Sequence, residues 1–174
     1  MNGAYLHLLI NHVPVIGVPF AFFLLLFGLM RKSRDLVQAG FFALIVMGVL
    51  AYPVLKSGGM AAHVLRGVPE IIRERVHEHA EAADFGFWGS IILGVISLIG
   101  FWTNAKTQNL SKGWAWTGLI VALWLSTVMA RVAHLGGLIR HPEIAKDFAP
   151  PNASETVKPP AAQQLPPEMA KPKK

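Results

Sequence analysis

The sequence contains no cysteine and few charged residues, and both shortages narrow what the chain can be. Without cysteine there is no disulfide, no thiolate metal site, no iron–sulfur cluster and no covalent attachment of a c-type haem. A metal or a haem must therefore be held by His, Met, carboxylate or Tyr. Charged residues make up only 15% of the chain, against about 25% in soluble domains, whereas 53% of the residues are hydrophobic. This composition predicts an integral membrane protein.

The excess of basic residues, a formal net charge of +6, does not indicate a nucleic-acid-binding protein. The basic residues lie in short loops between apolar runs and in a Pro-rich tail, so no soluble basic domain carries them. Charges in such places usually flank membrane spans. No Lys or Arg precedes the first apolar run, which is also too long for the core of a signal peptide. We therefore expect this run to remain in the protein as a span.

Four apolar runs are long enough to cross a membrane, since a spanning helix needs about 20 apolar residues. They cover approximately residues 4–30, 36–55, 85–102 and 114–139. Short connections make sequential neighbours antiparallel, so we expect an all-α domain over residues 1–141, a four-transmembrane-helix up-down bundle. The one substantial loop is expected at residues 57–84. Within it, a helix that starts near Pro69 should continue directly into the third span.

Residues 142–174 form a Pro-rich tail that cannot bury a core, so we expect it to be extended or disordered. Basic residues near span ends predict orientation. Three of them lie in the turn at residues 31–35, and Lys106 and Lys112 lie in the turn at residues 103–113. The other end carries Lys56, Arg66, Arg73, Arg75 and the tail. The dense turn at residues 31–35 favours a cytoplasmic side there. This predicts a multi-pass protein of the inner (cytoplasmic) membrane with both termini extracytoplasmic.

All seven histidines are expected at one end of the bundle. They are His7, His12, His63, His77, His79, His134 and His141. At about 1.5 Å per helical residue, they lie about 27 Å or more from the turns at residues 31–35 and 103–113. A preference for interfaces explains several of them, but His12 and His134 are surrounded by apolar sequence. Ionisable side chains within a span are costly and usually face a partner or a cofactor.

Imidazoles in a membrane bundle bind haem iron, bind copper or zinc, or relay protons. A haem needs two imidazoles at one height on different helices, and the expected heights pair His12 with His134 and His7 with His79. The residues that follow His79 and precede His134 are often small. Such residues either leave room for a porphyrin or allow close helix packing.

Arg131 lies one turn before His134, within the fourth span, where an arginine requires an anion. The sequence offers a carboxylate, Asp84 or Glu81, or a haem propionate as the partner. His77 and Glu81 are four residues apart and could share a metal ion, whereas His77 and His79 point about 200° apart on a helix. No protease, triad, phosphate-loop or nucleotide motif is present, so we expect no catalytic activity of the chain's own.

Residues 7–14, HLLINHVP, read His-x4-His-x-Pro at the start of the first span. This resembles a large bacterial family of small four-helix membrane proteins that is classed only as a domain of unknown function. Residues 57–62, SGGMAA, and His79 are similar to features of that family after its second helix and near the top of its third. The resemblance covers residues 5–140. It implies a histidine-rich, haem-binding module of the outer membrane leaflet that is associated with electron-transfer systems.

We therefore expect a cytochrome b-like subunit of a respiratory or photosynthetic electron-transfer complex, with one or two haems b near the extracytoplasmic face. Two of His12, His134, His79 and His7 would ligate haem, and Arg131 would bind a propionate. The expected partners are other membrane subunits, an extracytoplasmic cytochrome c, quinone and the lipid bilayer, and no nucleic acid. Two alternatives remain, a cofactor-free accessory subunit and a protein that handles copper or zinc.

Overall fold

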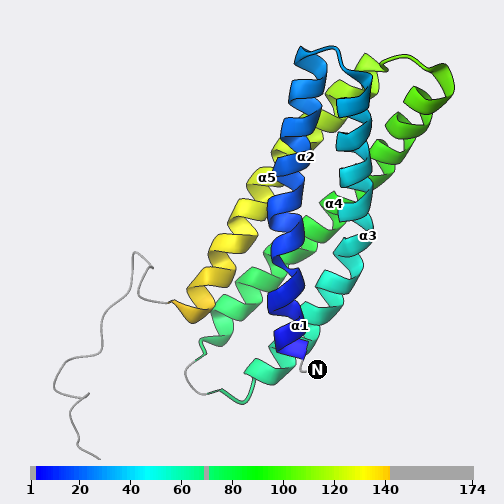
Figure 1. Cartoon of the computed structure of the whole chain (residues 1–174). Coiled ribbons are helices and arrows are strands. Elements are labelled where there is room, and N and C mark those ends of the chain that lie inside the picture. Colours follow the sequence, from blue (N-terminus) through cyan, green and yellow to red (C-terminus); the bar gives the residue numbers. More distant parts are fainter. Residues whose placement is uncertain (1–2, 69–70, 142–174) are drawn as a thin grey trace, which may run out of the picture.

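The computed structural model describes residues 3–68 and 71–141, and the predicted tail lies outside them. The described residues form five α-helices and no strand. The helices are α1 (Gly3–Ile10), α2 (His12–Met30), α3 (Arg34–Leu65), α4 (Arg73–Thr107) and α5 (Lys112–Arg140). Because α2 continues the course of α1, the chain passes along the bundle four times (Figure 1). The prediction of an all-helical, up-down bundle is confirmed.

Each of the four passes is long and apolar enough to cross a membrane, and the shortest has 28 residues. The outside of the bundle is apolar as well. Phe20, Phe42, Trp88 and Trp102 each expose more than half of their surface, whereas a soluble monomer rarely shows large contiguous apolar patches. The length and the apolar exterior both fit a multi-pass membrane protein.

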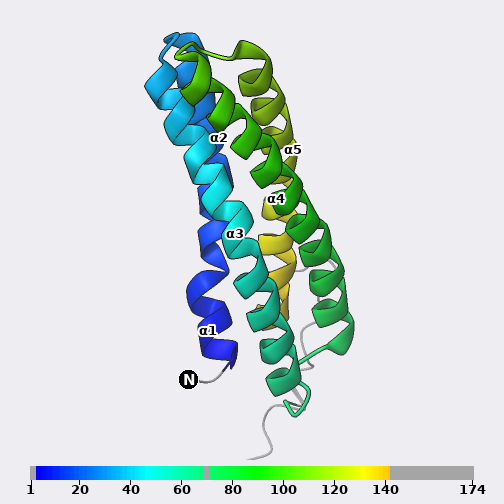
Figure 2. The same ribbon diagram turned by 90° about the vertical axis from the view of Figure 1, so that its right-hand side faces the viewer.

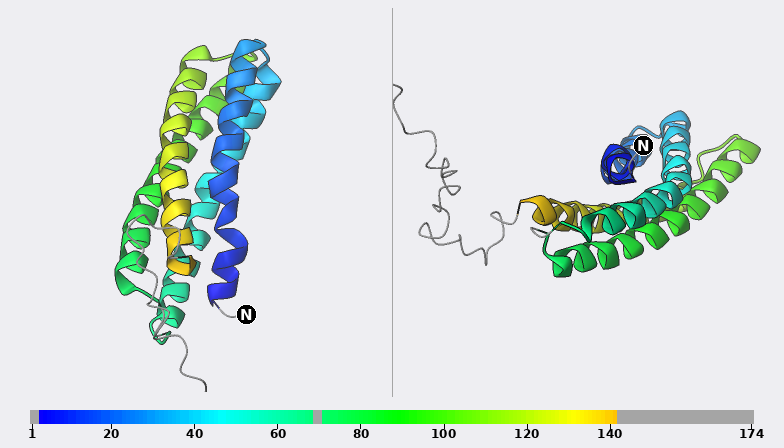
Figure 3. Two further views of the ribbon diagram at one scale, coloured as in Figure 1. Left: turned by 90° about the vertical axis from the view of Figure 1, so that its left-hand side faces the viewer. Right: turned by 90° about the horizontal axis from the view of Figure 1, so that it is seen from below.

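The helices are arranged as a closed ring of neighbours, in which α3 packs on α2 and α4, and α5 packs on α4 and α2. Figure 2 shows α3 and α4 side by side, and Figure 3 shows α5 beside α4. The turns that join α2 to α3 and α4 to α5 lie at one end (Figure 1). The start of α1, the end of α3, the start of α4 and the end of α5 meet at the other.

Helix α3 is longer than its apolar run, and the loop predicted at residues 57–84 is therefore wrong. Helix α3 continues through the two glycines at 58 and 59 as far as Leu65, and α4 already begins at Arg73. Each glycine costs a helix about 1 kcal/mol, but Ser57 is fully buried and packing stabilises this stretch. The unbroken run of α4 into the third span confirms the predicted continuation.

The first span is divided in two at Asn11. Pro14 has no N–H to donate to the carbonyl of Ile10, and its ring crowds that carbonyl. The helix therefore ends at Ile10, although Asn11 still donates its N–H to the His7 carbonyl at 2.9 Å. Helix α1, which precedes this break, packs mainly on α3. The break thus lets the first eight helical residues follow the end of α3.

Helices α3 and α4 approach closely at two facing glycines, Gly48 and Gly94. A Cβ atom on Gly48 would lie 3.1 Å from the Ser90 carbonyl oxygen and 3.2 Å from the Gly94 Cα. Since both obstacles are backbone atoms, no side chain can move aside to relieve the contact. Small residues at such crossings allow membrane helices to pack through their backbones.

We predict that Gly48→Ala destabilises the bundle by about 1–3 kcal/mol, the usual cost of overpacking. The measurement is the midpoint of unfolding by SDS in mixed micelles. Gly59→Ala on the same helix is the matched control, because its Cβ would meet no atom within 4 Å in the described chain. Equal midpoints for the two variants would contradict the close crossing.

Candidate functional site

The histidines lie on the helix segments that meet at one end of the bundle. His7 is on α1, His12 begins α2 and His63 is in the last turn of α3. His77 and His79 are in the first turns of α4, His134 is near the end of α5, and His141 follows it. Figure 1 shows these segments together, opposite the two turns. The gathering of histidines that the sequence predicts is therefore present.

Two of these histidines, His7 and His79, form a pair across the bundle. Their ring centroids are 6.4 Å apart, and their planes are inclined by 73°. Both side chains are partly buried, in contrast to the other histidines, which are exposed. The predicted match in height between His7 on the first span and His79 on the third is thus realised as a contact between rings.

A hydrogen-bond chain fixes the protonated nitrogen of His7. The Nδ1 atom lies 3.1 Å from the Ser57 hydroxyl, and that hydroxyl donates its proton to the Val54 carbonyl at 2.8 Å. A hydroxyl has one proton to donate, so a Ser57 hydroxyl that donates to the Val54 carbonyl accepts from His7. The proton of the neutral imidazole is therefore on Nδ1, and Nε2 carries the lone pair.

His79 has the same tautomer, and one hydrogen bond is sufficient to infer it. Its Nδ1 atom lies 3.0 Å from the backbone carbonyl of Val132 on α5. A carbonyl oxygen only accepts, so Nδ1 must be the donor. Both imidazoles consequently present an unprotonated Nε2. Metal-bound histidines are commonly oriented in this way, with the other ring nitrogen donating to a carbonyl or another acceptor.

A glycine supports each ring. A Cβ atom on Gly58 would lie 3.2 Å from His7 Cε1, and one on Gly136 would lie 3.1 Å from His79 Cε1. A side chain at either position would require its imidazole to shift by a few tenths of an ångström. Helices α3 and α5 thus supply both a hydrogen-bond acceptor and a glycine support to a ring on a neighbouring helix.

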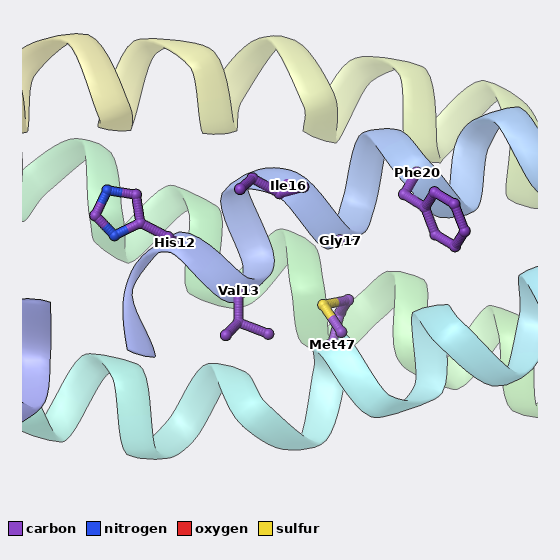
Figure 4. Close-up of a pocket in the computed structure, with 6 residues that line it drawn as sticks. All are labelled: His12, Val13, Ile16, Gly17, Phe20 and Met47. Atoms are coloured by element: carbon purple, nitrogen blue, oxygen red, sulfur yellow. The ribbon is translucent and has the colours of Figure 1, made fainter. Parts of the chain in front are cut away.

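The inward orientation that the sequence predicts for His12 and His134 is not found. Both side chains are exposed, and His12 Nδ1 contacts the Leu8 carbonyl of the preceding turn at 3.2 Å. His12 lines an open, apolar groove of about 340 Å³ between α2 and α3. Figure 4 shows Met47 reaching toward Gly17 in this groove, with His12 at one end. Neither histidine faces the other across the bundle interior.

Arg131 is exposed too, on α5. The predicted ion pair with Asp84 is not formed, and Arg131 has no ion-pair partner among residues 3–68 and 71–141. It instead lines a groove between α4 and α5 that Glu78 and Glu81 share. The predicted contact between His77 and Glu81 is present at 3.4 Å, but both side chains are more than 60% exposed.

The donor set at this end therefore consists of two imidazoles. In the described part of the chain, no three side chains of His, Asp or Glu come together as a metal-binding group. The sequence located the paired histidines but missed Ser57 as the acceptor and Gly58 and Gly136 as supports. The residues SGGMAA pointed to the first two only through their resemblance to a family motif.

We predict that ¹⁵N NMR of the cofactor-free protein, at a pH where both rings are neutral, shows His7 and His79 as Nδ1–H tautomers. Imidazole in water favours the Nε2–H form, and exposed His63 provides that internal reference. Assignment by His7→Gln and His79→Gln identifies the two signals. Ser57→Ala should return His7 toward the reference pattern and leave His79 unchanged. An Nε2–H signal from both histidines of the native chain would refute the hydrogen-bond arrangement.

The chain was compared with family models, with curated proteins and with solved structures. No family model matches it, and neither the curated proteins nor the solved structures give a match. The resemblance to a family of small four-helix membrane proteins therefore stays a prediction, and the functional argument rests on the histidine pair.

Proposed function

We propose that the protein is a membrane-embedded, b-type haem subunit of an electron-transfer complex, with His7 and His79 as the axial ligands of one haem. The observation that carries this proposal is the pair of imidazoles with centroids 6.4 Å apart, each held at Nδ1 by a hydrogen bond that leaves Nε2 without a proton. Imidazole–metal bonds are about 2 Å long, which separates the centres of two imidazoles on opposite sides of one ion by about 6 Å. The porphyrin would supply the remaining four nitrogens.

The number of donors favours haem over a bare metal ion. Zinc takes four ligands, and even catalytic zinc sites draw three of them from the protein. Copper(I) favours thiolate and thioether sulfur, and the chain has no cysteine, so a copper(I) site would need methionine in addition to the two imidazoles. Two imidazoles from separate helices are sufficient for haem iron, because only its two axial positions are open to the protein.

The position of the pair supports a role at the membrane surface. His7 is in the short α1 that begins the first span and His79 is in the first turns of α4, so a haem between them would lie near one end of the spans. The opposite end carries the basic turn with Arg31 and Lys32, which favours the cytoplasm. We therefore place the haem near the extracytoplasmic face of the inner membrane, where a cytochrome c and other membrane subunits could exchange electrons with it.

The test is haem loading of the purified protein, followed by a reduced-minus-oxidised absorption spectrum. We expect an α band of a low-spin b-type haem in the native protein and its loss in both His7→Ala and His79→Ala. His12→Ala and His134→Ala are the matched controls, since these exposed histidines should leave the band unchanged.

The same preparation separates the alternatives. A native protein that shows no haem band but binds copper or zinc stoichiometrically would replace haem with a metal ion at the site. The absence of both would leave a cofactor-free accessory subunit. Loss of the band in His12→Ala with retention in His7→Ala would move the ligand set to the pair that faces outward.

A further inference from the structure

A second site lies on the outside of the bundle, next to His79. It is a groove of about 660 Å³ between α4 and α5, a size typical of small-molecule sites. Helix α4 contributes Glu78, Glu81, Ala82 and Phe85, and α5 contributes Trp124, Thr127, Val128, Arg131 and Leu135. The residues on each helix recur at intervals of three and four, so each helix turns one continuous face to the groove.

The groove changes from polar to apolar along its length. Helices α4 and α5 are antiparallel, and His79 on α4 contacts Val132 on α5. This register places Glu78, Glu81 and Arg131 at the histidine end. Phe85 and Trp124 follow toward the middle of the spans. A ligand of this groove must therefore have a polar head near the membrane surface and an apolar part that extends into the hydrocarbon.

The polar end can both donate and accept hydrogen bonds. Arg131 forms no hydrogen bond or ion pair within the described residues, so its guanidinium donors are available. Glu78 and Glu81 offer carboxylate acceptors, of which Glu81 also contacts His77 at 3.4 Å. Among the lining residues, two carboxylates against one guanidinium give this end a formal charge of −1. That charge disfavours an anionic lipid headgroup. A neutral ring with oxygen atoms at both ends matches the donor and the acceptors.

We propose that this groove binds the ring of a lipid-soluble quinone or quinol. Arg131 donates to an oxygen of the ring, Glu78 and Glu81 accept from the hydroxyl groups of the quinol form, and Phe85 and Trp124 contact the ring face and its chain. Arg131 is thereby assigned to the quinone in place of a haem propionate. Binding does not depend on haem, but a role for this ligand in electron transfer rests on the proposed function.

Two residues of the groove are direct sequence neighbours of His79, the proposed haem ligand, and of the residue that accepts its hydrogen bond. Glu78 precedes His79 on α4, and Arg131 precedes Val132, whose carbonyl accepts from His79. A quinone ring in the groove and the His79 imidazole would thus be separated by no more than the backbone of one helix. This proximity is what a quinone that exchanges electrons with a His79-bound haem requires.

Quenching of tryptophan fluorescence by decylubiquinone tests the proposal in nanodiscs of phosphatidylcholine. We expect a saturable component that Trp124→Phe abolishes, and an affinity that falls about tenfold or more in Arg131→Gln, as for the loss of a hydrogen bond from a charged group. Glu81→Gln should weaken the quinol form more than the quinone form. Arg140→Gln and Glu74→Gln are the matched controls, because both residues lie outside the groove lining.

The haem-free His79→Ala variant separates this proposal from the previous one. Saturable quenching in that variant supports the groove whether or not the native protein binds haem. Quenching that stays linear in the native protein, or that Trp124→Phe leaves intact, overturns the quinone site even if haem binds. Displacement of the quinone by phosphatidylethanolamine at equal mole fraction would also overturn it, because the groove would then be a lipid headgroup site.

Discussion

The hydrogen bond between His7 Nδ1 and the Ser57 hydroxyl is the interaction on which the proposed site depends. With the Ser57 proton donated to the Val54 carbonyl of its own helix, Ser57 accepts from His7. It fixes the His7 proton on Nδ1, as the Val132 carbonyl does for His79. Two imidazoles are thus held by hydrogen bonds with their basic nitrogens unprotonated. Hydrogen bonds at Nδ1 thus orient both rings in the chain without a ligand.

The irregular parts of the fold serve to bring these two rings together. Pro14 interrupts the first span. The short helix α1, which precedes this break, packs on α3 at the level of Ser57. Helix α3 in turn extends past its apolar run, so that Ser57 and Gly58 reach His7. On the other side, α4 begins well before the apolar part of the third span, and this polar extension carries His79. The Ser57 acceptor on α3 and His79 on α4 thus lie where these two helices exceed the length of their apolar runs.

Hydropathy and loop length were sufficient to predict the bundle, because apolar runs of membrane length with short turns allow few arrangements. Helical rise was sufficient to match His7 and His79 in height. It could not predict the direction of a side chain around the helix axis. The sequence therefore also predicted His12 and His134 as haem ligands, although both are exposed. The end of α3 was also missed, because Gly58 and Gly59 lower helix propensity and only tertiary packing offsets that. Contacts between distant residues, such as His79 with Val132, leave no trace in one sequence.

Low-temperature EPR of the haem-loaded ferric protein tests the histidine pair most directly. The ring planes of His7 and His79 are 73° apart, and axial imidazoles close to perpendicular leave two iron d orbitals nearly equal in energy. We predict a low-spin signal of strong anisotropy that disappears in His7→Ala and in His79→Ala. A high-spin signal, or the rhombic low-spin spectrum of parallel imidazoles, would contradict the pairing of these two rings on one iron.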